Sequence, residues 1–293
     1  MPLLPDHASI SRIKLPVVII ILLTHLGAVA ALFAFSWTGV GIAVALCYAT
    51  GALGITLGYH RLLTHGSFRC HPWTRYVLTI LGCLALQGGP VSWVAYHRLH
   101  HKGSDHAPDP HSPKVVNFLW SHMLWLFWSD PGLPDEAAER AMTRDLLRDR
   151  GLDRIHRLFF LLNLALGLAL FGLGYAIDGW AGGWSVFLWA FCMRAVLVWH
   201  STWFVNSATH LWGYRNYETP DNSRNTWWVA LLTFGEGWHN NHHADQRSAA
   251  HGHRWFEIDP TYLVIRLLER VGLAWDVVVP RHRERMSRVR KAA

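Results

Sequence analysis

The sequence predicts an all-α integral membrane protein, in which four transmembrane helices carry a cytoplasmic helical cap that holds a histidine-rich dinuclear metal site. The first observation is composition: 51% of the 293 residues are hydrophobic and only 16% are charged, whereas about 25% are charged in an average soluble domain. The second is a repeated HxxHH motif, which comprises His97, His100, His101, His239, His242 and His243.

Four apolar stretches are long enough to cross a bilayer, since about 20 apolar residues span its hydrocarbon core. They cover residues 17–37, 39–59, 159–177 and 184–204. Because only short links join the first stretch to the second and the third to the fourth, we expect two helical hairpins.

The rest of the chain is expected to form the cap, from residues 60–157 and 205–280, and a basic tail at 281–293, all within one domain. A further apolar stretch, residues 76–94, is interrupted by the sequence QGGP at 87–90. We interpret this stretch as interfacial or buried in the cap, and a re-entrant or spanning segment is the alternative.

Basic residues predict the orientation. Arg12 and Lys14 precede the first apolar stretch and the tail at 281–293 is strongly basic, whereas the links 36–39 and 178–183 contain no Lys or Arg. Loops rich in Lys and Arg stay in the cytoplasm, so we expect both termini and the cap on the cytoplasmic side. The first stretch is too long for a signal peptide and lacks a clear cleavage site, and we expect it to be retained.

Other residues exclude some classes of protein. Cys47, Cys70, Cys83 and Cys192 form no CxxC pair, so we expect no structural disulfide. The net charge of +7 fits a cytoplasmic face that attracts anionic lipid or an acidic partner. The sequence does not predict nucleic-acid binding, because it contains no basic stripe with interleaved aromatic residues. Arg194 lies inside the fourth stretch, where snorkelling or pairing within the helical bundle explains it better than catalysis.

Two further motifs add candidate metal ligands. GYHRLLTH contains His60 and His65, which a regular helix would separate by about 140° of rotation, so the helix must end or bend between them if both bind one metal. NSATHLWG contains Asn206 and His210, which share a helix face. The histidines of each HxxHH motif also share one face, and all these segments lie on the predicted cytoplasmic side.

The candidate ligands are therefore nine imidazoles, with Asn206 able to hold a water. They are His60, His65, His97, His100, His101, His210, His239, His242 and His243. Nine exceeds the four ligands of a tetrahedral zinc, which favours two metals of higher coordination number, and imidazole suits iron, copper and zinc alike. Carboxylates near the motifs are expected to orient the rings: Asp105, Asp109, Glu236 and Asp245.

The other histidines are expected to lie elsewhere. We interpret seven as core or interfacial residues: His7, His25, His122, His156, His251, His253 and His282. Four are weaker candidates for contact with the metal site: His71, His106, His111 and His200.

These motifs resemble those of membrane fatty-acid desaturases. HxxxxH, HxxHH and HxxHH occur in this order, with NSAxHxxG between the last two, within residues 53–259. The resemblance is to stearoyl-type Δ9 desaturases of bacterial and cyanobacterial type, which act on acyl-CoA or acyl-lipid, and it separates this chain from alkane hydroxylases and sterol oxidases. It implies a mushroom-like protein of the bacterial inner membrane, with two irons bound by the nine histidines and by Asn206 through water. Zinc is an alternative occupant of the site in purified samples.

The resemblance implies an oxidoreductase that uses O₂ and two external electrons to insert a cis double bond, expected at Δ9, into a long-chain saturated acyl group. The sequence contains no cysteine cluster for an Fe–S centre and no haem domain, so we expect a separate electron donor, ferredoxin or a cytochrome b5-like protein with its reductase. CoA, acyl carrier protein and glycerolipid all remain open as the acyl carrier.

We expect the acyl chain in a bent tunnel between the cap and the second and fourth apolar stretches. Tyr48 is a candidate for closing its far end, although lipid-facing or interhelical packing explains this residue equally well. Candidate contacts with the head group are Trp93, Trp212, Arg215, Asp221, Asn222 and Arg224.

Two alternatives to desaturation stay open. A hydroxylase on the same di-iron scaffold differs only in the fate of the substrate radical. A histidine-rich membrane metal transporter or sensor would handle metal without consuming oxygen. A zinc peptidase of the HExxH class is disfavoured because that motif is absent.

Overall fold

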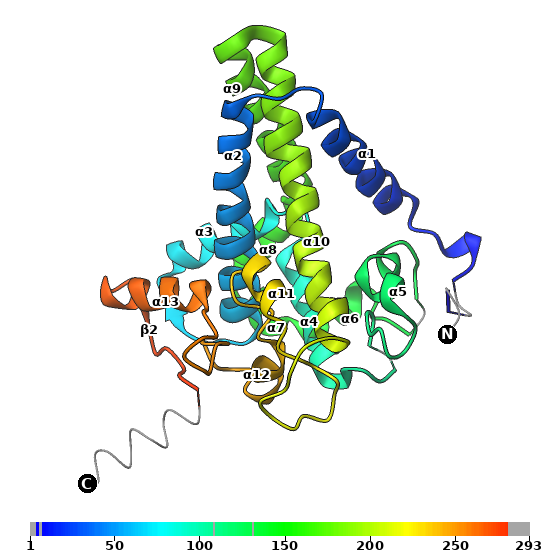
Figure 1. The fold of residues 1–293 in the computed structure, drawn as a ribbon, viewed down its shortest axis with the longest axis vertical. Coiled ribbons are helices and arrows are strands. Elements are labelled where there is room, and N and C mark those ends of the chain that lie inside the picture. Colours follow the sequence, from blue (N-terminus) through cyan, green and yellow to red (C-terminus); the bar gives the residue numbers. More distant parts are fainter. Residues whose placement is uncertain (1–3, 6–7, 108, 131, 281–293) are drawn as a thin grey trace.

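Long apolar helices form a stem above a broader cap of short helices (Figure 1). The computed structural model describes residues 4–5, 8–107, 109–130 and 132–280. The predicted basic tail at 281–293, together with His282 and His7, lies outside the described residues. The expected helical architecture is confirmed with one correction: strands β1 (Arg69–Cys70) and β2 (Ala274–Trp275) pair as a small antiparallel sheet.

The stem contains two helical stretches that are long and apolar enough to cross a membrane, Trp37–Thr64 and Phe159–His210. The second stretch reverses direction at Asp178 and Gly179, where the backbone angles are not helical. The apolar helix α1 (Leu15–Ala31) is shorter, with 17 residues, and leans away from the stem (Figure 1).

Two predicted boundaries were wrong. The first helix ends at Ala31 rather than 37, because Ser36 already caps the next helix by accepting a hydrogen bond from the Gly39 amide (3.0 Å). The second was expected to end at 59. Instead α2 (Trp37–Cys47) continues as the π-helical segment η2 (Tyr48–Thr64).

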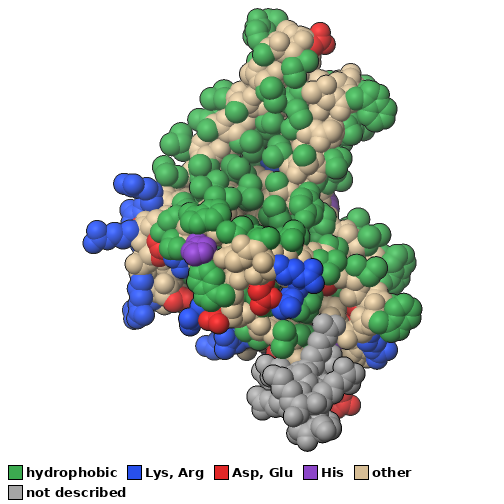
Figure 2. All heavy atoms as spheres, turned by 90° about the vertical axis from the view of Figure 1, so that its left-hand side faces the viewer, with side chains coloured by type: hydrophobic (Ala, Val, Ile, Leu, Met, Phe, Trp, Pro, Cys, Tyr) green, Lys and Arg blue, Asp and Glu red, His purple; other side chains and the backbone are tan. Residues whose placement is uncertain are grey.

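The third and fourth predicted stretches appear as α9 (Phe159–Phe187), η4 (Leu188–Met193) and α10 (Arg194–Ser207), followed by the 3-10 turn η5 (Ala208–His210). Large hydrophobic side chains on the stem are exposed, and Leu168 of the second stretch is 66% exposed. On the face in Figure 2, hydrophobic side chains cover the stem, whereas charged side chains gather on the cap. This surface suits a stem surrounded by lipid.

The stretch 76–94, predicted as interfacial or buried, comprises most of α3 (Pro72–Cys83), the connecting residues 84–89 and the start of α4 (Pro90–Gly103). Helix α3 packs against η2. Gly54 and Gly58 permit this contact: a Cβ at Gly54 would lie 2.5 Å from the carbonyl carbon of Leu81. Small residues allow helix backbones to approach in this way. With 12 residues α3 is too short to span a bilayer, and the spanning alternative was wrong.

The cap consists of short helices around the lower end of the stem (Figure 1). They are α4 (Pro90–Gly103), α5 (Phe118–His122), η3 (Leu124–Leu126), α6 (Glu136–Met142), α7 (Arg144–Leu147), α8 (Arg150–Arg157), α11 (Trp227–Leu232), α12 (His239–Ala244) and α13 (Pro260–Arg270). The four cysteines are free, as predicted.

Candidate metal centre

The nine predicted ligands come from four segments that meet where the stem joins the cap. Segment η2 carries His60 and is followed directly by its C-cap residue His65, and η5 carries His210. Helices α4 and α12 each present one HxxHH motif. The nine rings divide into a five-histidine group (His60, His65, His97, His101 and His242) and a four-histidine group (His100, His210, His239 and His243).

Within each group one nitrogen per ring lies within 4.8 Å of all the others. In the five-histidine group Nε2 of His101 is 3.0 Å from Nε2 of both His97 and His242. A neutral imidazole has one donor and one acceptor nitrogen, so His101 cannot satisfy both neighbours by hydrogen bonding. Converging lone pairs of this kind fit a bound cation.

The π-helical end of η2 explains how His60 and His65 share a site. The amide of His65 donates to the carbonyl of His60 (3.2 Å), an i→i+5 bond that places residues five apart above one another. The two ring centroids are 4.8 Å apart. The sequence required a helix end or a bend here, and the π-helix supplies the wider turn.

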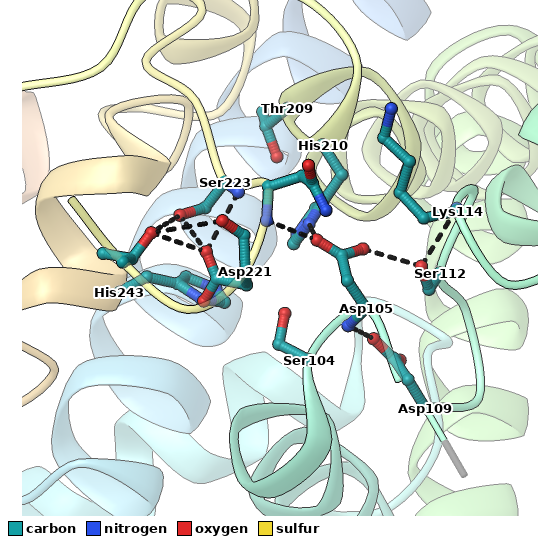
Figure 3. A network of polar contacts seen from close by, with 12 residues as sticks. Ser104, Asp105, Asp109, Ser112, Lys114, Thr209, His210, Asp221, Ser223 and His243 are labelled. Carbon is teal, nitrogen blue, oxygen red and sulfur yellow. Dashed lines mark hydrogen bonds and ion pairs between the residues drawn. The ribbon is translucent and has the colours of Figure 1, made fainter. Parts of the chain in front are cut away.

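In the four-histidine group, three rings point Nδ1 at an aspartate. Figure 3 shows His210 beside Asp105 and His243 beside Asp221. His210 lies 3.0 Å from Asp105, and His100 lies 3.0 Å from Asp109. The third pair is His243 and Asp221, 2.6 Å apart. Nε2 of His210 and of His243 is buried without a hydrogen-bond partner, so both rings are oriented with Nε2 available to a metal.

These aspartates are carboxylates at neutral pH. Burial alone would raise the pKa of Asp105, Asp109 and Asp221, but the facing histidines lower each pKa well below its ordinary value. Their negative charge offsets a cationic metal centre.

In the five-histidine group, Glu236 is the carboxylate that contacts a ring nitrogen. Its carboxylate lies 2.6 Å from Nδ1 of His60 and 3.1 Å from Nδ1 of His251. Arg61, which is fully buried, donates to Glu236 and to Asp259 at 2.9 Å each. Although burial opposes ionisation, His251, Arg61 and His60 hold the pKa of Glu236 well below its usual range.

Most of the rings are neutral, as metal ligation requires. Burial and the neighbouring histidines lower the pKa of five rings well below the ordinary value: His65, His97, His101, His239 and His242. Burial also lowers the pKa of His243, to about 4. The exception is His100, where the charge of Asp109 outweighs burial and raises the pKa.

Three of the four carboxylates chosen from sequence lie against these rings: Asp105, Asp109 and Glu236. Asp245 is the C-cap residue of α12, directly after His243 and Ala244, and its role stays a prediction. Asp221 and Asn222 were expected at a head group, but the structure places Asp221 on His243 and the Asn222 amide 2.6 Å from Asp105. This loop therefore closes over the four-histidine group.

Sequence reasoning missed Arg61 and the place of His251. His251 was interpreted as a core or interfacial residue; it is buried, and its ring also lies 4.4 Å from that of His242. No local spacing relates Arg61 or His251 to the HxxHH motifs, so only the fold reveals them. His111, a weaker candidate from sequence, has its ring 4.6 Å from that of His100.

Three other histidines form a separate row between α1, α10 and α5. Nε2 of His25 is 3.1 Å from His200, whose Nδ1 is 2.9 Å from His122. His200, a weaker candidate for the metal site, thus lies in this row instead. Two further rings contact the cap: His71 lies 4.9 Å from Trp275 between centroids, and Nδ1 of His253 lies 2.9 Å from the hydroxyl of Tyr217.

His106 and His156 also lie in the cap. Nδ1 of His106 lies 2.9 Å from the carbonyl of Ser104. His156 belongs to α8 and packs on Gly89, where a Cβ would lie 2.2 Å from its Nδ1.

A cavity of about 260 Å³ leads to both groups of histidines. Its walls come from η2, α10 and the end of α11, and His60, His97 and His239 line its inner end together with Asn206. Gly51, which precedes His60 along η2, also lines the cavity. An apolar cavity ending at imidazoles suits a hydrocarbon chain.

Tyr48 does not line this cavity. Its ring packs edge-on against Phe234, 5.7 Å away between centroids, and Phe234 forms part of the cavity wall. Any effect of Tyr48 on the far end is therefore indirect.

One polar bridge crosses the cavity wall. Gln87 donates from Nε2 to the hydroxyl of Thr202 (2.8 Å) and accepts from the indole N–H of Trp93 (3.4 Å). Both Thr202 and Trp93 line the cavity. Trp93, expected near the head group, thus lies beside the candidate ligand His97.

The remaining head-group candidates lie outside this cavity as far as the described residues show. Trp212 is 52% exposed and contacts Phe118. Arg215 donates to Thr219, and Arg224 donates to the carbonyl of Gly213. Their role in substrate binding stays a prediction.

Comparison with known proteins agrees with this geometry. The profile of the fatty acid desaturase family matches residues 35–276. The chain is 48% identical to the sn-1 stearoyl-lipid 9-desaturase of Anabaena variabilis, over 86% of this chain and 89% of the relative. It is also 48% identical to the enzyme of the same name from Synechocystis sp., over 84% and 74%. The sn-2 palmitoyl-lipid 9-desaturase of Nostoc sp. is 45% identical, over 83% of each chain. The chain therefore belongs to the fatty acid desaturase family and is an oxidoreductase that acts on fatty-acyl chains.

Proposed function

We propose that this chain inserts a cis double bond at carbon 9 of a long saturated acyl group carried by a glycerolipid. The similar cyanobacterial proteins are lipid 9-desaturases by name, which supports both the position and the carrier. The observation that carries the proposal is the cavity, because its apolar walls end at His60, His97 and His239, one or more from each group of histidines.

The residues present fit two irons. Each group offers four or five nitrogens within 4.8 Å of one another, and His210 and His243 point an unpartnered, buried Nε2 away from their aspartates. Two irons would supply the activation of O₂ that removal of hydrogen from an unactivated methylene needs. Asn206, which lines the same cavity as His239, would hold a water.

The protein's own part is to position the chain and to keep water out. Gly51, Ile55 and Val198 give the cavity an apolar wall, and carboxylates hold the ring nitrogens in place. A fixed distance between the inner end and the lipid head group selects the carbon that reacts.

The proposal places the cap on the cytoplasmic side of a bacterial inner membrane, below four spans. The basic residues that flank α1, Arg12 and Lys14, support this orientation. The spans are α1, α2 with η2, and the two arms of the stretch Phe159–His210.

The proposal also includes a separate electron donor with an acidic surface, a ferredoxin or a cytochrome b5-like protein. A second pocket, of about 590 Å³, opens on the cap beside β1 and β2. Arg69, Arg98 and Arg247 line it, and so does His65 of the five-histidine group. Electron transfer slows steeply with distance, so the point where the surface reaches a candidate ligand is the favourable place for a donor to dock.

Expression in a desaturase-deficient host tests the proposal, with the double-bond position in each lipid class read by mass spectrometry. We expect a cis 9-monoene in glycerolipids that disappears in His243→Ala. A hydroxylated product would identify a hydroxylase instead. Bound iron without any product, with a donor supplied, would favour a metal-handling protein.

A further inference from the structure

Arg194 is a fully buried cation inside the stem, and its hydrogen-bond partners are carbonyl groups. It donates from Nη1 to the carbonyl of Leu84 (2.6 Å) and from Nε to that of Ala190 (3.1 Å). No carboxylate of the described residues forms an ion pair with it. A buried charge without a carboxylate partner is costly, so its contact with Leu84 needs an explanation.

Leu84 is the middle of three consecutive residues whose carbonyls bind side chains of the stem. Asn163 of α9 donates to the carbonyl of Cys83 (3.0 Å), and Trp199 of α10 donates from Nε1 to that of Ala85 (3.0 Å). The last carbonyls of a helix have no partner within it. Here the end of α3 is satisfied by side chains that belong to two stem helices.

The segment that follows, residues 83–89, adopts an unusual backbone. Leu86 has φ +60°, which is uncommon for a residue other than glycine, and Gly88 has φ +98°. Such a conformation persists only where the surroundings impose it. The three side-chain contacts at Cys83, Leu84 and Ala85 supply that constraint.

The same segment builds the cavity wall. Gln87, two residues after Ala85, bridges Thr202 and Trp93, and both of these line the cavity. Trp93 stacks on the candidate ligand His97, with ring centroids 5.0 Å apart. A shift of the segment would therefore move the wall that touches the acyl chain next to the metal site.

We propose that Arg194, together with Trp199 and Asn163, sets the position of the new double bond. By holding residues 83–89 these side chains fix the bridge of Gln87, and the bridge fixes which methylenes lie beside His97. Neither Arg194 nor Trp199 lines the cavity, so both are positioning residues. The inference rests on the proposed desaturase function.

The test compares positional isomers made by Arg194→Met, Arg194→Lys and Trp199→Phe. Trp199→Phe keeps an aromatic ring and removes the indole N–H. We expect the share of monoenes with the bond away from carbon 9 to rise about tenfold in Arg194→Met and in Trp199→Phe, the size of effect of one lost pocket contact. Arg194→Lys keeps a cationic donor and should restore most of the wild-type pattern.

Ser185→Ala is the matched control, because it removes another polar contact within the bundle, from Ser185 Oγ to the carbonyl of Ala34 (2.7 Å), away from residues 83–89. If Arg194→Met and Trp199→Phe are active and give the wild-type isomer pattern, the inference is overturned. If Arg194→Met fails to accumulate, Trp199→Phe decides. A wild-type enzyme that makes no 9-monoene would instead refute the proposed function.

Discussion

Oδ2 of Asp221 lies 2.6 Å from Nδ1 of His243, so Nε2 is the nitrogen of that ring left for a metal. Asp105 holds His210 in the same way. The two aspartates are linked, since the backbone amide of Asn222, the residue after Asp221, donates to Asp105. The arrangement orients the four-histidine group before any metal binds.

Asp221→Asn should therefore weaken metal binding without removing a ligand. We expect iron affinity to fall about 10-fold to 100-fold, the usual effect of losing a residue that orients a ligand. Competition with a calibrated chelator measures it. Asp276→Asn, an exposed carboxylate on the cap, is the control, and equal affinity in both variants would contradict the role of Asp221.

Arg61→Met should destabilise the fold. Arg61 is fully buried and pairs with Glu236 and Asp259, so its removal leaves two buried carboxylates without their cation, at a cost of about 3–5 kcal/mol. Thermal unfolding in detergent measures the change. Arg69→Met breaks the exposed pair with Asp276 and should change stability by less than about 0.5 kcal/mol. A similar loss in both variants would argue against the buried pair.

Gly51→Val should shift the enzyme toward shorter acyl chains. A Cβ at Gly51 would lie 3.4 Å from the ring of Phe234 and 3.6 Å from Val198, so a larger side chain fills the cavity at this level. The chain lengths of the monoenes, read by gas chromatography, report it. Gly41→Val adds the same atoms where nothing lies within 4 Å and should leave chain length unchanged; an unchanged profile in Gly51→Val would show that the chain does not reach this level.

His122 should make stability depend on pH. Burial and His200 lower its pKa to about 4, whereas the unfolded chain takes up a proton near pH 6.5. The unfolded state thus binds more protons between these values, and the free energy of unfolding falls as pH drops from about 6.5 to about 4, by up to about 1.4 kcal/mol per pH unit. The slope should be smaller in His122→Asn. Equal slopes in the two proteins would contradict the shifted pKa.

Arg247→Glu should weaken the interaction with an acidic electron donor. Arg247 lines the cap pocket that reaches His65, and we expect a higher KM for the donor and a smaller dependence on salt. Lys114→Glu makes the same charge change at another exposed position. Turnover with a chemical reductant should stay the same in both variants. Equal KM values for the donor in Arg247→Glu and Lys114→Glu would show that the donor does not dock at this pocket.

The candidate ligands could be predicted from the sequence because short motifs contain them. HxxHH places three rings on one helix face whatever the rest of the fold does. Asp105, Asp109 and Glu236 were found for a similar reason, since each lies within a few residues of a motif. The apolar stretches likewise predicted a helical stem from composition alone.

Other features depend on contacts between distant residues. Asp221 is 22 residues from His243, and Arg61 is 175 from Glu236, and no periodicity relates such pairs. The π-helical end of η2 could not be predicted either, because the helix propensities of its residues do not distinguish a π-helix from an α-helix. Arg194 could be placed within the bundle, but its partner at Leu84 emerged only from the fold.

Counting the metals tests the central claim most directly. Protein purified without oxygen from iron-grown cells should contain two irons per chain by elemental analysis, with activity proportional to iron content, and His243→Ala should contain about one. Full desaturase activity with a single iron per chain, or with none, would contradict a centre built from both groups of histidines.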